Sequence, residues 1–137
     1  MADTKCVLII DDSLPLGVIA NTAAVLAASL GRLYPEMIGE DLRDHQGQVH
    51  EGITTLALPI LKGTPALLKT LRAQLRESEP ALLVVDLISA TRTTRSYAEY
   101  AAVLAQGPDA AIQYQGLGLL GERTAVTRLT GNLGLLR

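Results

Sequence analysis

The stretch that decides the fold is KCVLIIDDS, residues 5–13. Its unbroken apolar run before two aspartates is typical of a strand that is covered on both faces. A short LPLG connection follows, and residues 18–30 are rich in Ala and Leu and stop before Gly31, which predicts a helix closed by a glycine cap. A strand that enters a helix through a short Gly/Pro loop is the usual opening of a layered α/β domain.

The rest of the chain continues to alternate strands with helices. Residues 44–49 predict a turn in which Gly47 takes a positive φ, and Thr64 with Pro65 predicts a capped helix start. Residues 81–88 form the most apolar segment after the first strand, so we expect them at the centre of the sheet. The other predicted elements are a short strand at 37–39, strands over 53–60 and 112–120, and helices over 66–77, 96–105 and 122–129.

This order predicts a single α/β domain spanning residues 1–137. We expect a three-layer α/β/α sandwich with a mixed central sheet of four to five strands. A chain of 137 residues is long enough to bury about two-thirds of its unfolded surface. The chain has no Phe and no Trp, so the core is expected to be aliphatic.

Composition also narrows the classes of partner. The net charge is −2, and four tyrosines are the only aromatic side chains, which makes nucleic-acid binding unlikely on both electrostatic and stacking grounds. The single Cys6 lies in the first apolar run and cannot form an internal disulfide, which fits a reducing cytoplasm. The first run is too short for an export signal, and the stretch 18–30 is interrupted by polar residues, so we expect no membrane segment.

A candidate ligand cleft follows from the topology. In open α/β sheets, ligands bind outside the carboxyl ends of the strands, and exposed N–H groups at a helix start favour anions. The alternative is that the polar residues there form only a strand-to-helix turn and local loop contacts. The candidate ligand-binding residues at these strand ends are Asp12, Ser13, Gly17, Asn21, Thr22, Thr91, Arg92 and Arg95.

Asp86 is the candidate catalytic residue. It interrupts the apolar segment 81–88, and a carboxylate in such surroundings must be paired, or its proton affinity changes and it becomes a candidate general base. The structural alternative is a partner for a loop N–H or for Arg92 or Arg95.

Other familiar motifs are not supported. His45 and His50 lie five residues apart on a predicted turn, without the spacing of a metal site, so we predict no metal and no cofactor. Ser13 lacks the Gly-x-Ser-x-Gly context of a nucleophile elbow. The glycines at 116, 118 and 121 match a dinucleotide fingerprint in spacing, but they follow the last predicted strand and have no acidic residue about twenty positions later.

The two ends of the chain together resemble a known family. The stretches GLLGE at 118–122 and VTRLTGNLGLL at 126–136 are similar to the terminal signature of class II peptidyl-tRNA hydrolases. Gly17, Ile19 and Ala20 resemble the start of that family's first helix, and the Val-Asp step at Asp86 resembles its acidic strand end. An uncharacterised domain-of-unknown-function relative looks closer still, because it shares the LPxGxxAN pattern at 14–21 and the loop at 44–52.

The resemblance implies the hydrolase fold but few of the enzyme's working residues. Val18, Thr22 and Val25 stand where the hydrolases have Lys, Gln and His, and Ala90 stands in place of a Thr. Asp86 is the functional position that matches. We therefore expect a protein that binds a small or anionic ligand in the cleft. The alternatives are a divergent hydrolase acting on an ester or acyl substrate through Asp86, and a mainly structural homodimer.

Overall fold

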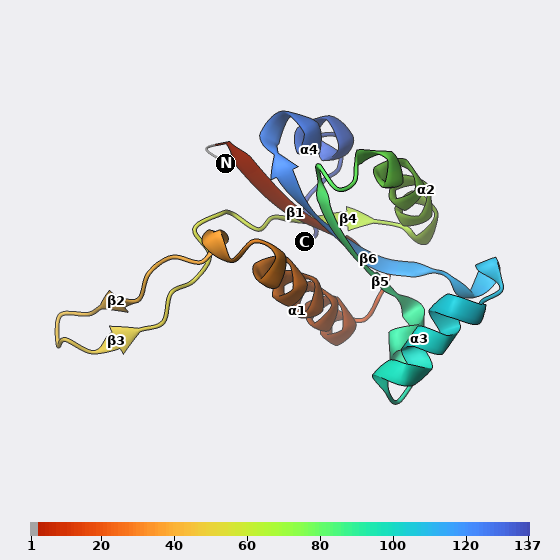
Figure 1. The fold of residues 1–137 in the computed structure, drawn as a ribbon, viewed down its shortest axis with the longest axis horizontal. Helices are drawn as coiled ribbons and strands as arrows, with labels where there is room; N and C mark the ends of the chain where they lie inside the picture. Colours follow the sequence, from red (N-terminus) through yellow and green to blue (C-terminus); the bar gives the residue numbers. More distant parts are fainter. Residues whose placement is uncertain (1–2) are drawn as a thin grey trace.

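The computed structural model describes residues 3–137 and shows a four-stranded mixed sheet with helices on both faces (Figure 1). The strand order is β4-β1-β6-β5. A separate two-stranded hairpin, β2–β3, projects away from this body. The elements are β1 (Thr4–Asp11), α1 (Leu16–Leu33), β2 (Leu42–Arg43), β3 (Val49–His50), β4 (Ile60–Gly63), α2 (Pro65–Leu75), β5 (Leu83–Ile88), α3 (Tyr97–Gln106), β6 (Tyr114–Glu122) and α4 (Arg123–Thr130), with short 3-10 turns η1 (Pro35–Met37), η2 (Arg76–Ser78), η3 (Ser89–Arg92) and η4 (Asp109–Ala111).

The strand directions place the carboxyl ends of three strands at the same end of the sheet. β1 runs parallel to β4 and antiparallel to β6, and β5 is also antiparallel to β6. β1, β4 and β5 therefore point the same way. At this end of the sheet the chain passes from β1 to α1, and from β5 to η3 and α3. The sequence analysis expects the ligand cleft at this end.

The core consists of two aliphatic clusters, one on each side of the sheet. Along β1, Val7 and Ile9 pack with residues of α2 and α4, whereas Cys6 and Leu8 pack with residues of α1. This alternation follows from the two-residue period of a strand and confirms that β1 is covered on both faces. Burial raises the pKa of the Cys6 thiol to about 11, so the thiol stays neutral at physiological pH.

Glycines of β6 set the distance between α1 and the sheet. A Cβ at Gly116 would lie 2.6 Å from Cγ2 of Thr22, and a Cβ at Gly118 would lie 2.9 Å from Cδ1 of Leu30. The glycine spacing that resembles a nucleotide motif in the sequence thus has a packing role, because it lets the helix approach the strand closely.

The structure corrects four expectations about the elements. Residues 37–39 do not form a strand, because Met37 belongs to η1 and Ile38 forms only an isolated bridge with Thr54. β5 is an edge strand, and β6 lies at the position expected for residues 81–88 because it pairs with both β1 and β5. Residues 53–59 are irregular, with one isolated bridge at Thr54, and the strand β4 begins only at Ile60. α1 includes Gly31 and ends at Leu33, with Tyr34 as its C-cap.

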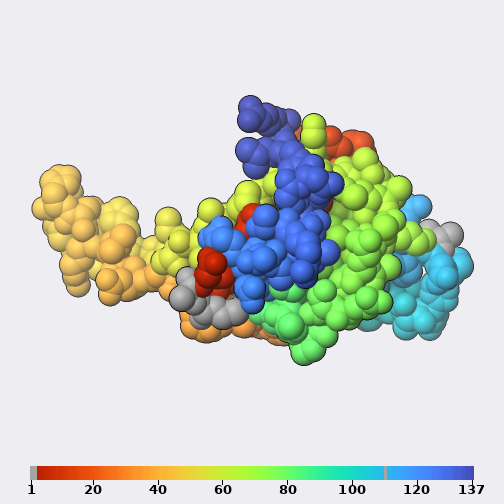
Figure 2. Space-filling view, turned by 90° about the horizontal axis from the view of Figure 1, so that it is seen from above, coloured from red at the N-terminus to blue at the C-terminus, as the bar shows by residue number. Residues whose placement is uncertain are grey.

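Residues 39–53 form an arm that extends far from the body, as Figures 1 and 2 show. Gly47 has a φ of 79°, which confirms the predicted turn. Asp44 holds the hairpin together by accepting hydrogen bonds from the backbone N–H groups of Gln46 and Gln48 and by contacting Nε2 of His50 at 2.8 Å. These contacts lower the pKa of Asp44, the His50 contact most of all.

Candidate functional site

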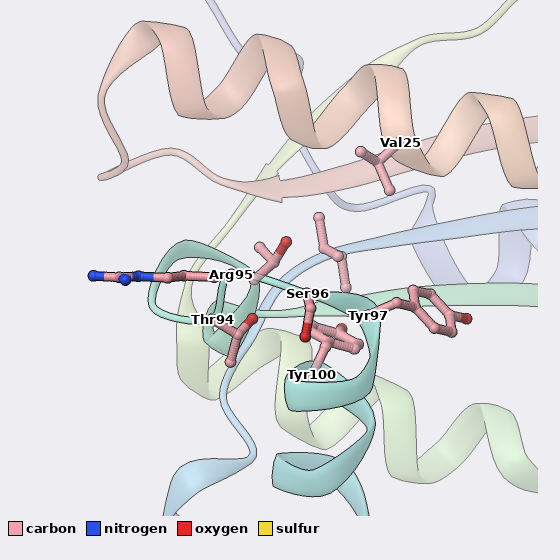
Figure 3. Close-up of a pocket in the computed structure, with 8 residues that line it drawn as sticks. Val25, Thr94, Arg95, Ser96, Tyr97 and Tyr100 are labelled. Atoms are coloured by element: carbon pink, nitrogen blue, oxygen red, sulfur yellow. The ribbon is translucent and has the colours of Figure 1, made fainter.

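A pocket of about 360 Å³ lies between α1 and the start of α3, at the carboxyl end of β5 (Figure 3). We call it the α1–α3 pocket. It combines apolar and aromatic walls with several hydroxyl groups and one cation. Its lining residues are Val25, Leu87, Thr91, Thr94, Arg95, Ser96, Tyr97 and Tyr100.

The amino end of α3 is fixed by its own side chains. The backbone N–H of Glu99 donates to Oγ of Ser96 at 3.1 Å, and the Glu99 carboxylate accepts from the backbone N–H of Arg95 at 2.9 Å. The first contact is the N-cap hydrogen bond of a capping box, and in the second the Glu99 carboxylate reaches the N–H of the residue before the N-cap. The α3 terminus is therefore occupied by its cap, and the polar side chains beside it remain for a ligand.

Two groups of the pocket have hydrogen-bonding capacity to spare. No hydrogen bond is found for the Thr91 hydroxyl within residues 3–137, and the Arg95 guanidinium has no ion pair there. In Figure 3, Arg95 extends away from the two tyrosines, toward the side on which α1 begins. The pocket thus has an aromatic end and a cationic end.

Tyr97 and Tyr100 form the aromatic end. Their ring centroids are 6.5 Å apart and the ring planes differ by 28°. The Tyr100 hydroxyl accepts a hydrogen bond from the backbone N–H of Ile88 at 2.9 Å, and burial raises the pKa of this phenol. Tyr100 therefore keeps its proton at neutral pH and can donate it in a hydrogen bond to a ligand acceptor.

The predicted ligand-binding residues are only partly brought together. Thr91 and Arg95 line the α1–α3 pocket, whereas Arg92 lines a separate depression on the other side of η3. Asn21 is exposed and lies one helical turn before Val25, on the same side of α1. Gly17 lies one further turn toward the start of α1, and it is exposed too. Asn21 and Gly17 thus continue the α1 wall of the pocket toward its cationic end.

Three other predicted residues have local structural contacts or lie apart. Thr22 is fully buried; its hydroxyl donates to the Val18 carbonyl and accepts from Nε2 of Gln115. Ser13 donates from both its backbone N–H and its hydroxyl to Oδ1 of Asp11, which is the strand-to-helix turn considered above. Asp12 is exposed beside this turn, and its backbone N–H donates to Gly63.

The start of α1 has no side-chain cap. Pro15 occupies the N-cap position, and the first turn contains no acidic residue. Its unsatisfied N–H groups and the helix dipole favour a negative charge. The start of α1 lies at the same end of the sheet as the α1–α3 pocket, where β1 and β5 finish.

Comparison with known proteins places the chain in a family. The family model described as a protein of unknown function, DUF2000, matches residues 4–137. The chain belongs to the DUF2000 family. A solved structure of a protein of unknown function from Agrobacterium tumefaciens strain C58 is similar to the DUF2000 chain over 98% of both chains, with a TM-score of 0.87 and 22% sequence identity. This similarity shows the fold. A search of curated proteins found no match to the chain at a significant level.

Asp86 of the DUF2000 chain is paired with an arginine that the sequence did not suggest. Its Oδ2 accepts from Nε of Arg72 at 2.7 Å, and Nη1 of Arg72 donates to Glu79 at 2.7 Å. Arg72 is 4% exposed. Burial alone would lower the pKa of Arg72, but the hydrogen bonds and charges of the two carboxylates outweigh it and raise that pKa. The guanidinium is therefore a permanent counter-ion for Asp86.

This ion pair lies on the α2 side of the sheet. Leu87 faces the α1 cluster, so its neighbour Asp86 points to the opposite face. The structure thus separates the Asp86 carboxylate from the α1–α3 pocket, where Thr91 and Arg95 lie. The expected partners Arg92 and Arg95 make no ion pair with Asp86 among the described residues.

Sequence reasoning missed the aromatic and apolar half of the pocket. Tyr97 and Tyr100 are three residues apart, which places them on one side of a helix that follows the Thr/Arg segment. Val25 contributes from α1. The tyrosine spacing was the available signal.

Two further properties of residues 3–137 concern metal binding and membrane insertion. No group of three or more His, Cys, Asp or Glu side chains is arranged to hold a metal ion in this part of the chain. α1 is long and apolar enough to cross a membrane by length and composition alone. Its inner side packs Leu26 and Leu30 against the sheet, while Leu16 and Leu33 are exposed.

Proposed function

We propose that the DUF2000 chain binds a small, partly apolar anion in the α1–α3 pocket. The observation that carries this proposal is the combination of an aromatic end, Tyr97 and Tyr100, with the unpaired guanidinium of Arg95 in one concave site. Ligand pockets are commonly lined by apolar side chains with a few polar groups that fix orientation. An elongated ligand would place its apolar part on the tyrosines and its anionic group near Arg95.

The energetics favour a ligand with both parts. A hydrogen bond to a charged group contributes about 1.5–3 kcal/mol, but an exposed Arg95 alone gives weak and salt-sensitive binding. Removing the apolar part of a ligand from water adds about 25 cal/mol per Å² of buried apolar surface. The hydroxyl of Thr91 and the phenol of Tyr100 then distinguish a carboxylate or phosphate from a halide by directed hydrogen bonds.

We further propose that the fold is a three-layer α/β/α sandwich of the class II peptidyl-tRNA hydrolase type, and that the protein is a cytoplasmic homodimer. Helices on both faces of a mixed sheet and the similarity at both ends of the chain support the fold assignment. The single buried thiol supports a reducing compartment.

Hydrolysis of an ester or acyl substrate through Asp86 is the second proposal. A depression on the α2 side, lined in part by Lys69, Arg72 and Arg76, gives an anionic substrate a place beside the Asp86–Arg72 pair. This site is distinct from the α1–α3 pocket, so the two proposals can be tested separately.

The binding proposal is tested by NMR titration of the isotope-labelled protein with aromatic and alkyl carboxylates, phenyl phosphate and their neutral alcohol or amide analogues. We expect shifts of the backbone signals of residues 87–100 and weaker binding of the neutral analogues. Arg95→Ala should reduce affinity about tenfold. Arg92→Ala is the matched control, because Arg92 is a neighbouring exposed arginine that lines a different depression.

Equal effects of Arg95→Ala and Arg92→Ala would show a diffuse electrostatic effect and contradict a defined site. An absence of shifts at residues 87–100 for every compound would reject the pocket. For the second proposal, turnover of activated esters or of N-blocked aminoacyl-tRNA should be lost in Asp86→Asn and kept in Arg95→Ala. The reverse result would move any chemistry to the α1–α3 pocket.

A further inference from the structure

A groove runs along the outer edge of β5, with a volume of about 510 Å³. Its floor is formed by Val84, Val85 and Asp86, and Arg32 and Tyr97 also line it. These two residues lie at opposite ends. α1 runs antiparallel to β5, which brings Arg32 to the amino end of β5, whereas α3 starts beyond its carboxyl end (Figure 1).

The backbone of β5 has free hydrogen-bonding groups along this groove. The Ile88 N–H points away from β6, because it donates to the Tyr100 hydroxyl. Peptide directions alternate along an edge strand, so the N–H and C=O groups of Val84 and Asp86 also point away from β6. No other strand pairs with this edge among residues 3–137.

The stretch of β5 with free backbone groups is short, and its two free residues lie on either side of Val85. Beyond its carboxyl end the outward N–H of Ile88 is occupied by Tyr100, and before its amino end the N–H of Leu82 donates to Ser78 at 2.9 Å. Val84 and Asp86 are the two outward-facing residues between these limits, and Val85 lies at their centre. A strand that binds here needs only a three-residue match.

We propose that β5 of a second copy of this chain pairs antiparallel with β5 across a two-fold axis at Val85. Val84 of each copy then faces Asp86 of the other, and each such pair exchanges two backbone hydrogen bonds. The result is one continuous sheet across both copies, which is an isologous interface. This inference rests on the proposed homodimer and names its surface, and it is independent of ligand binding.

Charge complementarity favours a second copy as the occupant. The same axis brings Arg32 of one copy toward the start of α3 of the other, where Glu99 and the exposed ring of Tyr97 lie. Arg32 has no ion pair within residues 3–137, and Tyr97 is 89% exposed. The Asp86 carboxylate does not oppose the pairing, because Arg72 neutralises it on the α2 side.

The interface would also complete the α1–α3 pocket. Tyr97 lines both that pocket and the β5 groove, so the second copy would cover the outer side of this ring. Dimerisation would thereby place a cation of the other copy, Arg32, near the aromatic end of the pocket.

The proposal is tested by sedimentation velocity of the full-length protein over a range of concentrations. We expect a dimer, and slow amide exchange at Val84 and Asp86 that becomes faster on dilution. Val84→Pro removes an outward N–H and leaves the bonds to β6 in place, since proline is tolerated at such edge positions. It should raise the dimer dissociation constant about tenfold or more, which corresponds to about 1.4 kcal/mol.

Val84→Ala is the matched control, because it changes the same side chain and keeps the N–H; its dimer should persist. Arg32→Glu should weaken the dimer, whereas Arg128→Glu on the exposed side of α4 should not. Circular dichroism and thermal unfolding of each variant separate a loss of pairing from a loss of folding.

The outcomes distinguish the β5 surface from the homodimer itself. A monomeric wild-type protein would overturn both. A dimer that Val84→Pro and Val84→Ala affect equally, but that Leu42→Asp in the arm dissociates, would overturn the β5 surface and leave the homodimer standing. Exchange protection at Val84 and Asp86 that is independent of concentration would also overturn it.

Discussion

The two edges of the sheet differ in how their backbone groups are satisfied. At the β4 edge, the C-terminal segment lies alongside the strand: the N–H of Lys62 donates to Gly134 and the N–H of Leu136 donates to Ile60, both at 2.9 Å. At the β5 edge, Tyr100 satisfies one N–H and the groups of Val84 and Asp86 remain open. Among residues 3–137, the chain covers one edge by itself and leaves the other open.

The sequences of the two strands make this difference informative. β4 is a four-residue strand that includes Lys62, whereas β5 is a six-residue apolar strand interrupted only by Asp86. Short, charged edge strands resist unwanted pairing, and a longer apolar edge invites it. The edge with the greater tendency to pair is thus the one that the chain does not cover, which indicates a specific use.

The largest expected effect is the loss of stability caused by Arg72→Ala, which removes the partner of Asp86 in the open strand β5. This change leaves the carboxylates of Asp86 and Glu79 without their buried counter-ion, and breaking such a pair destabilises a protein by about 3–5 kcal/mol. Chemical unfolding in urea measures the change. Arg76→Ala is the control, since Arg76 is exposed and lies 3.9 Å from Glu79; it should change stability by less than about 0.5 kcal/mol. Equal effects would show that burial of the ion pair does not matter.

Deletion of residues 134–137 should convert the covered edge into a second open edge. The loss of two backbone hydrogen bonds to β4 is expected to destabilise the fold by about 1–3 kcal/mol. Amide exchange at Lys62 should become faster, and self-association should increase. Deletion of Arg137 alone is the control. Unchanged exchange at Lys62 would mean that the C-terminal segment does not protect this edge in solution.

Tyr100→Phe should extend the open edge of β5 by one residue. The Ile88 N–H loses its acceptor while the ring is kept, so we expect a loss of about 1–2 kcal/mol in stability. Hydrogen exchange measures whether the Ile88 amide is selectively exposed. Tyr97→Phe is the matched control, because no hydrogen bond to the Tyr97 hydroxyl is found among residues 3–137.

The smallest effect concerns the interior strand between the two edges. Burial raises the pKa of Cys6 from 9.0 to about 11, so the neutral thiol stabilises the folded state fully below about pH 9, and this contribution is lost as pH rises toward 11. Relative to Cys6→Ala, the wild type should lose about 1 kcal/mol of stability by about pH 10 and none at neutral pH. A pH-independent difference would show that the interior of the sheet is hydrated.

The local elements were predictable from sequence, but the order of the strands was not. The apolar run of β1, the Thr64 cap and the Gly47 turn each depend on neighbouring residues, and the structure confirms them. The choice between β5 and β6 as the inner strand depends on long-range pairing. β5 is the more apolar of the two, but the glycines of β6 allow α1 to pack over it, and so β6 lies inside.

The candidate site was predictable in its position and only partly in its residues. Strand polarity predicts a cleft at the carboxyl ends of the strands, and the structure has a pocket there that is lined by Thr91 and Arg95. The partner of Asp86 was not predictable, because the rotation of α2 over the sheet decides that Arg72 reaches it. The tyrosines were not identified either, since their place beside the pocket depends on how α3 lies relative to α1.

The arm has a consequence for experiments on living cells. Its tip is organised by Asp44 through contacts within residues 44–50, and its base is pinned where Gly52 approaches Gly39 too closely for any side chain. The hairpin therefore carries its own order and shares little of the core. A fluorescent or epitope sequence inserted at Gly47 should leave the body folded, because exposed loop tips tolerate insertions. The arm thus offers a position for a label far from both sheet edges.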